Sequence, residues 1–390
     1  MSKNACCPPP KQKTTCCPPS EEHTAGLCSP PQSSVACCSE AVDDRPGYKL
    51  WPFVCGWISA SGQQIPKVVT HLTATDIAGR WQMRWGFGRM RYAIAPGLYA
   101  IGRPADDSPV LVTANYKMTF DILRRDMQGQ DAWLLVVDTK GINVWCAAGK
   151  GTFGTDEIVR QVKRTQLHSL VRHRTLILPQ LGAPGVAAHE VEKACGFKVL
   201  YGPVRSRDLP EFIRSGNKAS PGMRRVTFGL LDRLVLTPVE LVHMWRQILY
   251  SAVALFLLGG ISPDVFSLSA AWSRGGAGIL TLLLGLFTGA LLTPILLPWI
   301  PGRAFAMKGA IAGVVIGVSS AIVFADSLEW LNTLALVIAT ATISSWCAMH
   351  FTGSSTFTSP SGVEKEMRQA IPAQASALLV GVLCWLSAAF

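Results

Sequence analysis

The 390-residue sequence lacks the features that mark several common protein classes. Its first residues contain no apolar core segment, so we expect no signal peptide. Its 12 cysteines show neither the C-x-x-C spacing of zinc sites nor the C-x-x-C-x-x-C run of ferredoxins. It also has no basic-aromatic recognition motif, so its net charge of +11 does not indicate nucleic-acid binding, and we expect no nucleic-acid partner.

Apolar residues, by contrast, are abundant and unevenly distributed. They form 49% of the chain, and the mean hydropathy is +0.29. The composition changes near residues 44 and 235, which predicts a disordered Cys/Pro-rich arm over 1–44, a cytoplasmic α/β domain over 45–235 and a transmembrane domain over 236–390.

The last of these regions contains five long apolar stretches. Most approach the ~20 residues needed to cross a bilayer, and they are rich in the small residues that membrane helices use for packing. Five transmembrane helices are therefore expected, with buried helices of a soluble domain as the alternative. The stretches are "ILYSAVALFLLGGI", "AGILTLLLGLFTGALLTPILLPWI", "GAIAGVVIGVSSAIVFA", "LNTLALVIATATISSWCAM" and "AQASALLVGVLCWLSAAF".

The short connections between these stretches predict their orientation. Basic residues precede the first span and occupy the second-to-third and fourth-to-fifth connections, whereas the third-to-fourth connection holds only Asp326 and Glu329. Basic loops stay in the cytoplasm. We therefore expect a multi-pass protein of the cytoplasmic (inner) membrane with its N-terminal domain inside and its C-terminus outside. The positive charge then reflects topology and contact with anionic membrane lipid.

The N-terminal arm contains three adjacent cysteine pairs. Their soft thiolates could capture a thiophilic metal ion, and a solvated tail without an essential role and redox chemistry are the alternatives. The candidate metal ligands are Cys6, Cys7, Cys16, Cys17, Cys37 and Cys38.

Between residues 110 and 216, strand-like and helix-like segments alternate. Strands are expected at 110–116, 132–138, 142–146, 175–180 and 198–204, and helices at 117–128, 155–167, 185–196 and 208–216. This order predicts a Rossmann-like α/β domain: a mostly parallel sheet with helices on both faces. Ligands of such sheets bind at the carboxyl ends of strands, so Cys146, Gln180 and Pro203 are expected to line one rim.

The run "NVWCAAGKGTFG" (143–154) ends in a literal G-x-G-x-x-G. No acidic residue follows at the end of the next expected strand, and Lys150 is followed by glycine, so neither the dinucleotide nor the P-loop motif is complete. A large flat ligand is another interpretation, because Ala147, Ala148, Gly149 and Gly151 leave the backbone accessible around the Cys146 thiol. The alternative is that Cys146 is an ordinary small buried residue.

Four segments resemble the HgcA family, the corrinoid proteins of microbial mercury methylation, which is related to the corrinoid-binding domain of the corrinoid iron–sulfur protein of the acetyl-CoA pathway. They are "NVWCAAGKGTF" (143–153), "VTANYKMTFD" (112–121), "RTLILPQLGAPGV" (174–186) and "YGPVRSRDLPEF" (201–212). The order of a corrinoid domain followed by membrane spans is also similar.

The resemblance implies a cobalamin-type corrinoid whose cobalt takes the Cys146 thiolate as its lower axial ligand. It also implies a set of residues that contact the ring: Thr113, Asn115, Asn143, Val144, Trp145, Ala147, Ala148, Gly149, Lys150, Gly151, Thr152, Gln180, Leu181 and Gly182.

The implied activity is that of a corrinoid-dependent methyltransferase of anaerobic metabolism that transfers methyl from cobalt to Hg(II), giving methylmercury. The implied partners are a small ferredoxin with two four-iron clusters (HgcB-like) and a methyltetrahydrofolate-linked methyl donor. Hg(II) would then be the metal that the arm cysteines capture. A corrinoid methyl carrier of one-carbon metabolism with another acceptor is the alternative. A transporter with a regulatory soluble domain is a third hypothesis, and the near absence of ionisable residues in the spans disfavours it.

Overall fold

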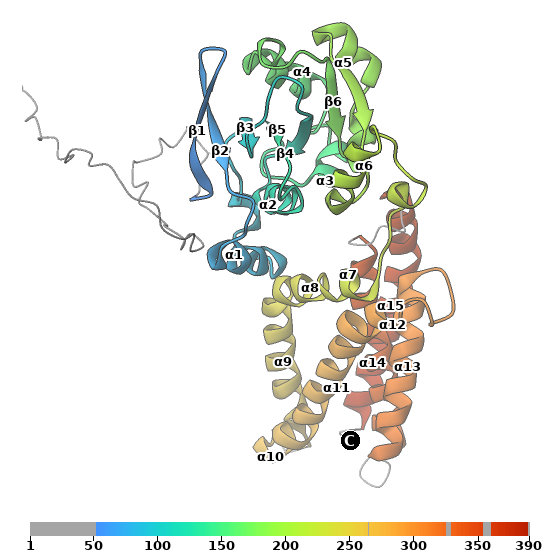
Figure 1. The fold of residues 1–390 in the computed structure, drawn as a ribbon. Coiled ribbons are helices and arrows are strands. Elements are labelled where there is room, and N and C mark those ends of the chain that lie inside the picture. The colour runs from blue at the N-terminus through green and yellow to red at the C-terminus, as the bar shows by residue number, and fades with distance from the viewer. Residues whose placement is uncertain (1–51, 264, 325–328, 354–359, 389–390) are drawn as a thin grey trace, which may run out of the picture. The chain divides into compact units, whose positions relative to one another are not determined.

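The computed structural model describes residues 52–263, 265–324, 329–353 and 360–388. The arm over 1–44, with its six candidate metal-binding cysteines, lies outside these residues. The described chain begins with a mixed sheet flanked by helices and ends with a series of apolar helices (Figure 1).

The sheet has seven strands in the order β1-β2-β3-β5-β4-β6-β7. Neighbouring strands from β5 to β7 are parallel, as expected, whereas β1 and β2 form an antiparallel hairpin and β3 runs antiparallel to β5. The sheet is therefore mixed. The strands are β1 (Val54–Ala60), β2 (Gln63–Val68), β3 (Gly97–Ile101), β4 (Val110–Ala114), β5 (Ala132–Val137), β6 (Thr175–Leu178) and β7 (Lys198–Tyr201).

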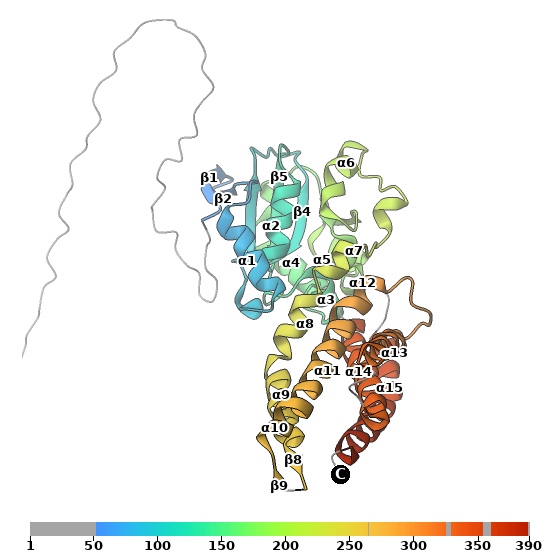
Figure 2. The same ribbon diagram turned by 90° about the horizontal axis from the view of Figure 1, so that it is seen from below.

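Helices cover both faces of this sheet (Figure 2). Every residue of β4 and β5 is buried, so their side chains alternate between two cores rather than between core and solvent. Val112 and Leu135 face one core, and Leu111 and Leu134 face the other. The first core is completed by α3 (Val144–Gly149), α4 (Thr155–Arg164) and α5 (Ala188–Cys195), and the second by α2 (Lys117–Asp126) and α6 (Leu209–Arg214).

One expected strand is wrong. Residues 142–146 do not continue the sheet; they form the end of a loop and the first turns of α3. The Asn143 side chain accepts a hydrogen bond from the Cys146 amide at 2.9 Å, and the Asn143 carbonyl accepts one from the Ala147 amide, also at 2.9 Å. This helix cap outweighs the strand preference of "VW".

Four helices of the C-terminal half are long and apolar enough to cross a membrane: Leu268–Leu296, Phe305–Val323 (α13), Trp330–Thr352 (α14) and Gly362–Ser387, which lies in α15 (Pro360–Ser387). The expected first span forms α9 (Trp245–Gly259), which has only 15 residues. It qualifies as a fifth span only together with Leu230–His243, from which it is bent by 58°. Five spans therefore represent the upper count for the described residues, and their orientation stays a prediction.

The remaining helices connect or extend these units. Small residues bring these apolar helices close: a β-carbon at Gly313 of α13 would lie 2.5 Å from Ala341 Cα of α14. The other helices are α1 (Ala74–Arg84), α7 (Leu230–Leu234), α8 (Thr237–His243), α10 (Leu268–Ala270), α11 (Gly276–Phe287) and α12 (Thr293–Leu296).

Candidate functional site

Cys146 lies on α3, a helix of six residues that follows β5. Its thiol is free and half-buried, and the neighbouring Trp145 side chain is 40% exposed. Cys146 is thus presented on a short, capped helix close to the carboxyl end of β5, rather than on the strand itself.

The loop before α3 is held by Asn115, whose side chain is completely buried. Its carbonyl oxygen accepts hydrogen bonds from the Thr139 amide (3.0 Å), the Thr139 hydroxyl (2.8 Å) and the Gly141 amide (3.0 Å). Its amide nitrogen donates to the Asp138 carboxylate at 3.1 Å. Asn115, expected as a ring contact, therefore has its side chain bonded to the loop that leads to Cys146.

The other side of α3 packs against the 3-10 turn Gln180–Gly185 (η3). A β-carbon at Gly185 would lie 2.9 Å from Ala148 Cα and 2.3 Å from the Phe153 carbonyl oxygen. At Gly182 it would lie 2.6 Å from the Phe153 ring. Ala147 and Ala148 of α3 are both buried and face the core of the domain. These small residues therefore allow two backbone segments to approach closely, and the alanines do not form an open surface beside the thiol.

A cavity of about 520 Å³ opens beside Cys146. This volume is within the range of about 300–1,000 Å³ that ligand sites usually have. Side chains distant in sequence form its walls, and three of them carry positive charge. It is lined by Gly86, Gly88, Arg89, Arg91, Tyr116, Gly141, Ile142, Asn143, Cys146, Lys150 and His243.

The electrostatics of this cavity favour neutral or electron-rich groups. Burial raises the pKa of Tyr116, although the Arg89 guanidinium opposes that rise, so the phenol stays protonated at neutral pH. Gly149 and Gly151 at the end of α3 face open space, because a β-carbon at either would have no neighbour within 4 Å. The accessible elements of the 143–154 run therefore include Trp145, Cys146, Lys150 and these two glycines.

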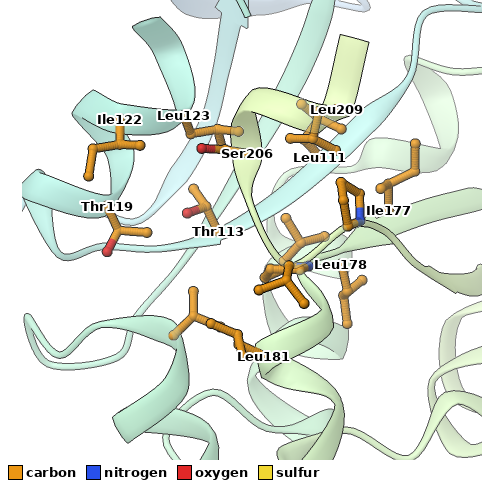
Figure 3. A pocket seen from close by; sticks show the side chains of 15 residues that line it. Leu111, Thr113, Thr119, Ile122, Leu123, Ile177, Leu178, Leu181, Ser206 and Leu209 are labelled. Atoms are coloured by element: carbon orange, nitrogen blue, oxygen red, sulfur yellow. The ribbon is translucent and has the colours of Figure 1, made fainter. Parts of the chain in front are cut away.

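A second hollow, of about 160 Å³, lies at the ends of β4 and β6 (Figure 3). Thr113, Val144, Leu181 and Pro203 line it together with apolar side chains of α2. It is smaller than a usual ligand site. The expected single rim is therefore divided, with Pro203 at this hollow and Cys146 at the larger cavity.

Two other predicted ring contacts, Gln180 and Thr152, form hydrogen bonds within the protein. The Gln180 side chain accepts a hydrogen bond from Arg224, and the Thr152 amide donates to the Ala147 carbonyl at 3.0 Å. These bonds fix the segments that flank α3.

The donor set limits which metals could bind at Cys146. Across the described ranges, no three His, Cys, Asp or Glu side chains are grouped as a metal site would need. A metal ion that Cys146 coordinates must therefore bring its other ligands with it, as the metal of a macrocycle does. The soft thiolate suits a transition metal of this kind.

The middle of the chain matches a known family. Residues 89–213 match the family model of the CO dehydrogenase/acetyl-CoA synthase delta subunit. The match begins at Arg89 and includes Tyr116, Asn115, Cys146 and η3.

Three relatives are similar over about a third of the chain, and each is a gamma subunit of the acetyl-CoA decarbonylase/synthase complex. The protein from Methanopyrus kandleri is 37% identical over 122 residues, which is 31% of this chain and 26% of the relative. Those from Methanothermobacter thermautotrophicus and Archaeoglobus fulgidus are 33% and 35% identical over 127 and 115 residues. These two alignments include 32% and 29% of this chain, and 27% and 24% of the respective relatives. This chain thus spans about a quarter of the length of these relatives.

Sequence reasoning missed the opposite wall of the cavity. Arg89, Arg91 and Tyr116 are separated from Cys146 by at least 30 positions, and only the fold brings them together. The charge-rich run "RMRY" (89–92) is the local signal for the two arginines, and Tyr116 lies in the segment 112–121.

Proposed function

We propose that this protein is a membrane-anchored corrinoid methyl carrier and methyltransferase in which the Cys146 thiolate is the lower axial ligand of cobalt. The observation that carries the proposal is the free thiol beside a 520 Å³ cavity with no other clustered metal ligands in the described chain. The acetyl-CoA decarbonylase/synthase relatives support it, because the sequence resemblance points independently to a corrinoid domain of the acetyl-CoA pathway.

The position of each side chain around the cavity suggests its role toward a bound corrinoid. Cys146 would bind the cobalt, and Asn143 and Asn115 hold the helix and loop that carry the thiol. Arg89, Arg91 and Lys150 can donate hydrogen bonds to amide oxygens at a ring edge. When bound, the corrinoid would supply a cobalt atom able to accept and donate a methyl group.

The finer proposal concerns the methyl acceptor, for which we propose Hg(II). An anionic thiolate donates more charge than a neutral imidazole, and an electrophile such as Hg(II) must receive the methyl group together with its bonding electrons. The resemblance of the 143–153 run to HgcA supports this acceptor. The matched relatives favour the alternative, a carrier of one-carbon metabolism with another acceptor. With Hg(II) as acceptor, a low-potential ferredoxin would return the electrons that leave with the methyl group, and with either acceptor a methyltetrahydrofolate-linked donor would supply the next methyl group.

The axial ligand can be tested by spectroscopy on the full chain in lipid nanodiscs without oxygen. Cys146→Ala should shift the visible spectrum of the bound corrinoid and lower methyl transfer by at least tenfold. Cys146→His should keep an axial ligand and give a different spectrum. The matched control is Cys195→Ala, since Cys195 is also half-buried and free, and its thiol donates only to the Val191 carbonyl. An unchanged spectrum in Cys146→Ala, with corrinoid bound, would refute the ligand assignment.

The acceptor is tested on the same methyl-loaded protein with Hg(II) supplied as its thiol complex. Methylmercury formed in excess of both free methylcobalamin and Cys146→Ala would support Hg(II). If the spectral result holds but no excess forms, the carrier with another acceptor replaces it.

A further inference from the structure

The first helix of the described chain has an unusual outer surface. On α1, Ile77, Trp81 and Trp85 recur at every fourth position and are 46%, 53% and 46% exposed. Residues spaced in this way lie along one side of a helix. Phe87, just after the helix, is 59% exposed. We define these four residues as the aromatic stripe.

The opposite side of α1 fixes the stripe outward. Asp76 is buried and accepts hydrogen bonds from Lys117 at 2.6 Å and from Arg124 at 2.7 Å, which join α1 to α2. Gly79 lies against the Tyr92 hydroxyl, and Met83 is buried. Because these contacts set the rotation of the helix about its axis, the stripe cannot turn into the core.

Positive charge accompanies the stripe. Residues 74–91 contain four arginines and one acid, Asp76, which is already paired. The Arg84 guanidinium lies 5.9 Å from the centre of the Trp81 ring. Burial lowers the pKa of Arg84, and the positive charges of Arg80 and Arg125 lower it further. The Arg80 Nε atom is buried without a hydrogen-bond partner in the described chain. The Asp232 carboxylate already opposes part of the decrease in the Arg84 pKa, and an anionic group near Arg80 and Arg84 would oppose it further.

The turn after α1 contacts the approach to the membrane helices. A β-carbon at Gly86 would lie 3.0 Å from the His243 ring of α8, and α8 leads directly into α9, where Trp245 is 55% exposed beside Arg246. Exposed tryptophans next to arginines are typical of protein surfaces at the lipid headgroup level.

We propose that the aromatic stripe of α1 docks on the headgroup region of an anionic membrane. Trp81 and Trp85 would enter the interface, and Arg80 and Arg84 would contact lipid phosphates. The membrane is favoured over a protein partner because four helices of this chain are long and apolar enough to cross a bilayer, and the anchor of the proposed function would make docking effectively intramolecular. Gly86, Gly88, Arg89 and Arg91 continue from this segment into the wall of the Cys146 cavity, so docking would hold that wall at the membrane surface.

The test uses the full chain in nanodiscs of phosphatidylcholine with or without phosphatidylglycerol, and lipids brominated near the headgroup as quenchers. Trp81→Phe/Trp85→Phe removes two of the 12 tryptophans. The matched control is Trp57→Phe, since Trp57 is equally exposed, at 54%, but lies on β1.

We expect the brominated lipid to quench wild type and Trp57→Phe to the same extent, and to quench the double variant measurably less. Arg84→Glu should also reduce the quenching, by more than half of the difference between wild type and the double variant. This reduction should occur only in nanodiscs that contain phosphatidylglycerol. Equal quenching of the double variant and Trp57→Phe would overturn the proposal. So would acrylamide quenching of Trp81 and Trp85 that is as strong in nanodiscs as in detergent, which would leave the stripe free for a protein partner. Neither outcome depends on corrinoid binding.

Discussion

Replacing Asn115 tests the interpretation that this residue positions Cys146 through the preceding loop. Asn115→Ala removes one acceptor that serves the Thr139 and Gly141 amides and one donor to Asp138. The Thr139 hydroxyl keeps a partner, because it also donates to the Ile142 carbonyl at 2.6 Å. The principal loss is therefore two buried backbone amides without acceptors.

The expected cost follows from these two amides. An unsatisfied buried donor costs about 1–3 kcal/mol. Two of them give about 2–6 kcal/mol, and water entering the space left by the side chain reduces the value to about 2–4 kcal/mol. This is a large part of the ~5–15 kcal/mol that stabilises a domain. Expressed as local opening, it corresponds to about 30- to 1,000-fold faster amide exchange.

Amide hydrogen exchange of the full chain measures this loss at the loop itself. In Asn115→Ala, Thr139 and Gly141 should lose protection by that factor, while amides in α5 should not change. Asn115→Asp keeps an acceptor oxygen for both amides, so these amides should lose less protection than in Asn115→Ala. Some loss is still expected, because the new carboxylate lies beside the Asp138 carboxylate. If Asn115→Ala changes exchange at 139 and 141 by less than threefold, Asn115 does not hold the loop.

Two further substitutions test other parts of the structure. Gly185→Ala should lower the free energy of unfolding by about 1–3 kcal/mol, because the added methyl group would lie 2.3 Å from the Phe153 carbonyl oxygen. Gly56→Ala is the control, since a β-carbon there has no neighbour within 4 Å, and it should be nearly neutral in the same denaturation assay. Asp76→Asn should cost about 3–5 kcal/mol, because it leaves two buried cations, Lys117 and Arg124, to share the Asp121 carboxylate. Burial opposes the ionisation of Asp76, but hydrogen bonds from Lys117 and the Thr73 backbone hold its pKa below the usual range. The Asp76 contribution is therefore present above about pH 4 and lost as the pH falls further, and thermal unfolding of wild type, but not of Asp76→Asn, should show this loss.

The sequence predicted the parallel half of the sheet well for a physical reason. Strands β4 to β7 are short apolar runs separated by helices with clear apolar periodicity, and burial on both faces demands this composition. The hairpin of β1 and β2 escaped prediction because exposed positions of β1 hold Cys55 and Trp57, so its polarity does not alternate, and because β2 includes Pro66. The first expected span, residues 248–261, lies almost entirely in α9, but the chain bends by 58° just before that helix, so only 15 residues run straight.

The site shows the same division between local and distant information. Cys146 was identified from a contiguous run, but the cavity beside it depends on Arg89 and Tyr116, which only the fold brings near. The small residues around the thiol were interpreted as space for a ring. The contacts of Ala148 and Gly185 show that part of this smallness serves backbone packing.

This distinction changes what the 143–154 run indicates about function. Two independent contacts fix α3: Asn115 through the preceding loop, and Gly185 through η3. A helix of six residues would not be stable by itself, so these contacts are what make the position of the Cys146 thiol definite. The ligand is then left with the thiol, Lys150 and the open edge at Gly149. A metal centre that arrives with its remaining ligands needs only one well-placed protein donor, and the proposed function assigns that role to the Cys146 thiol.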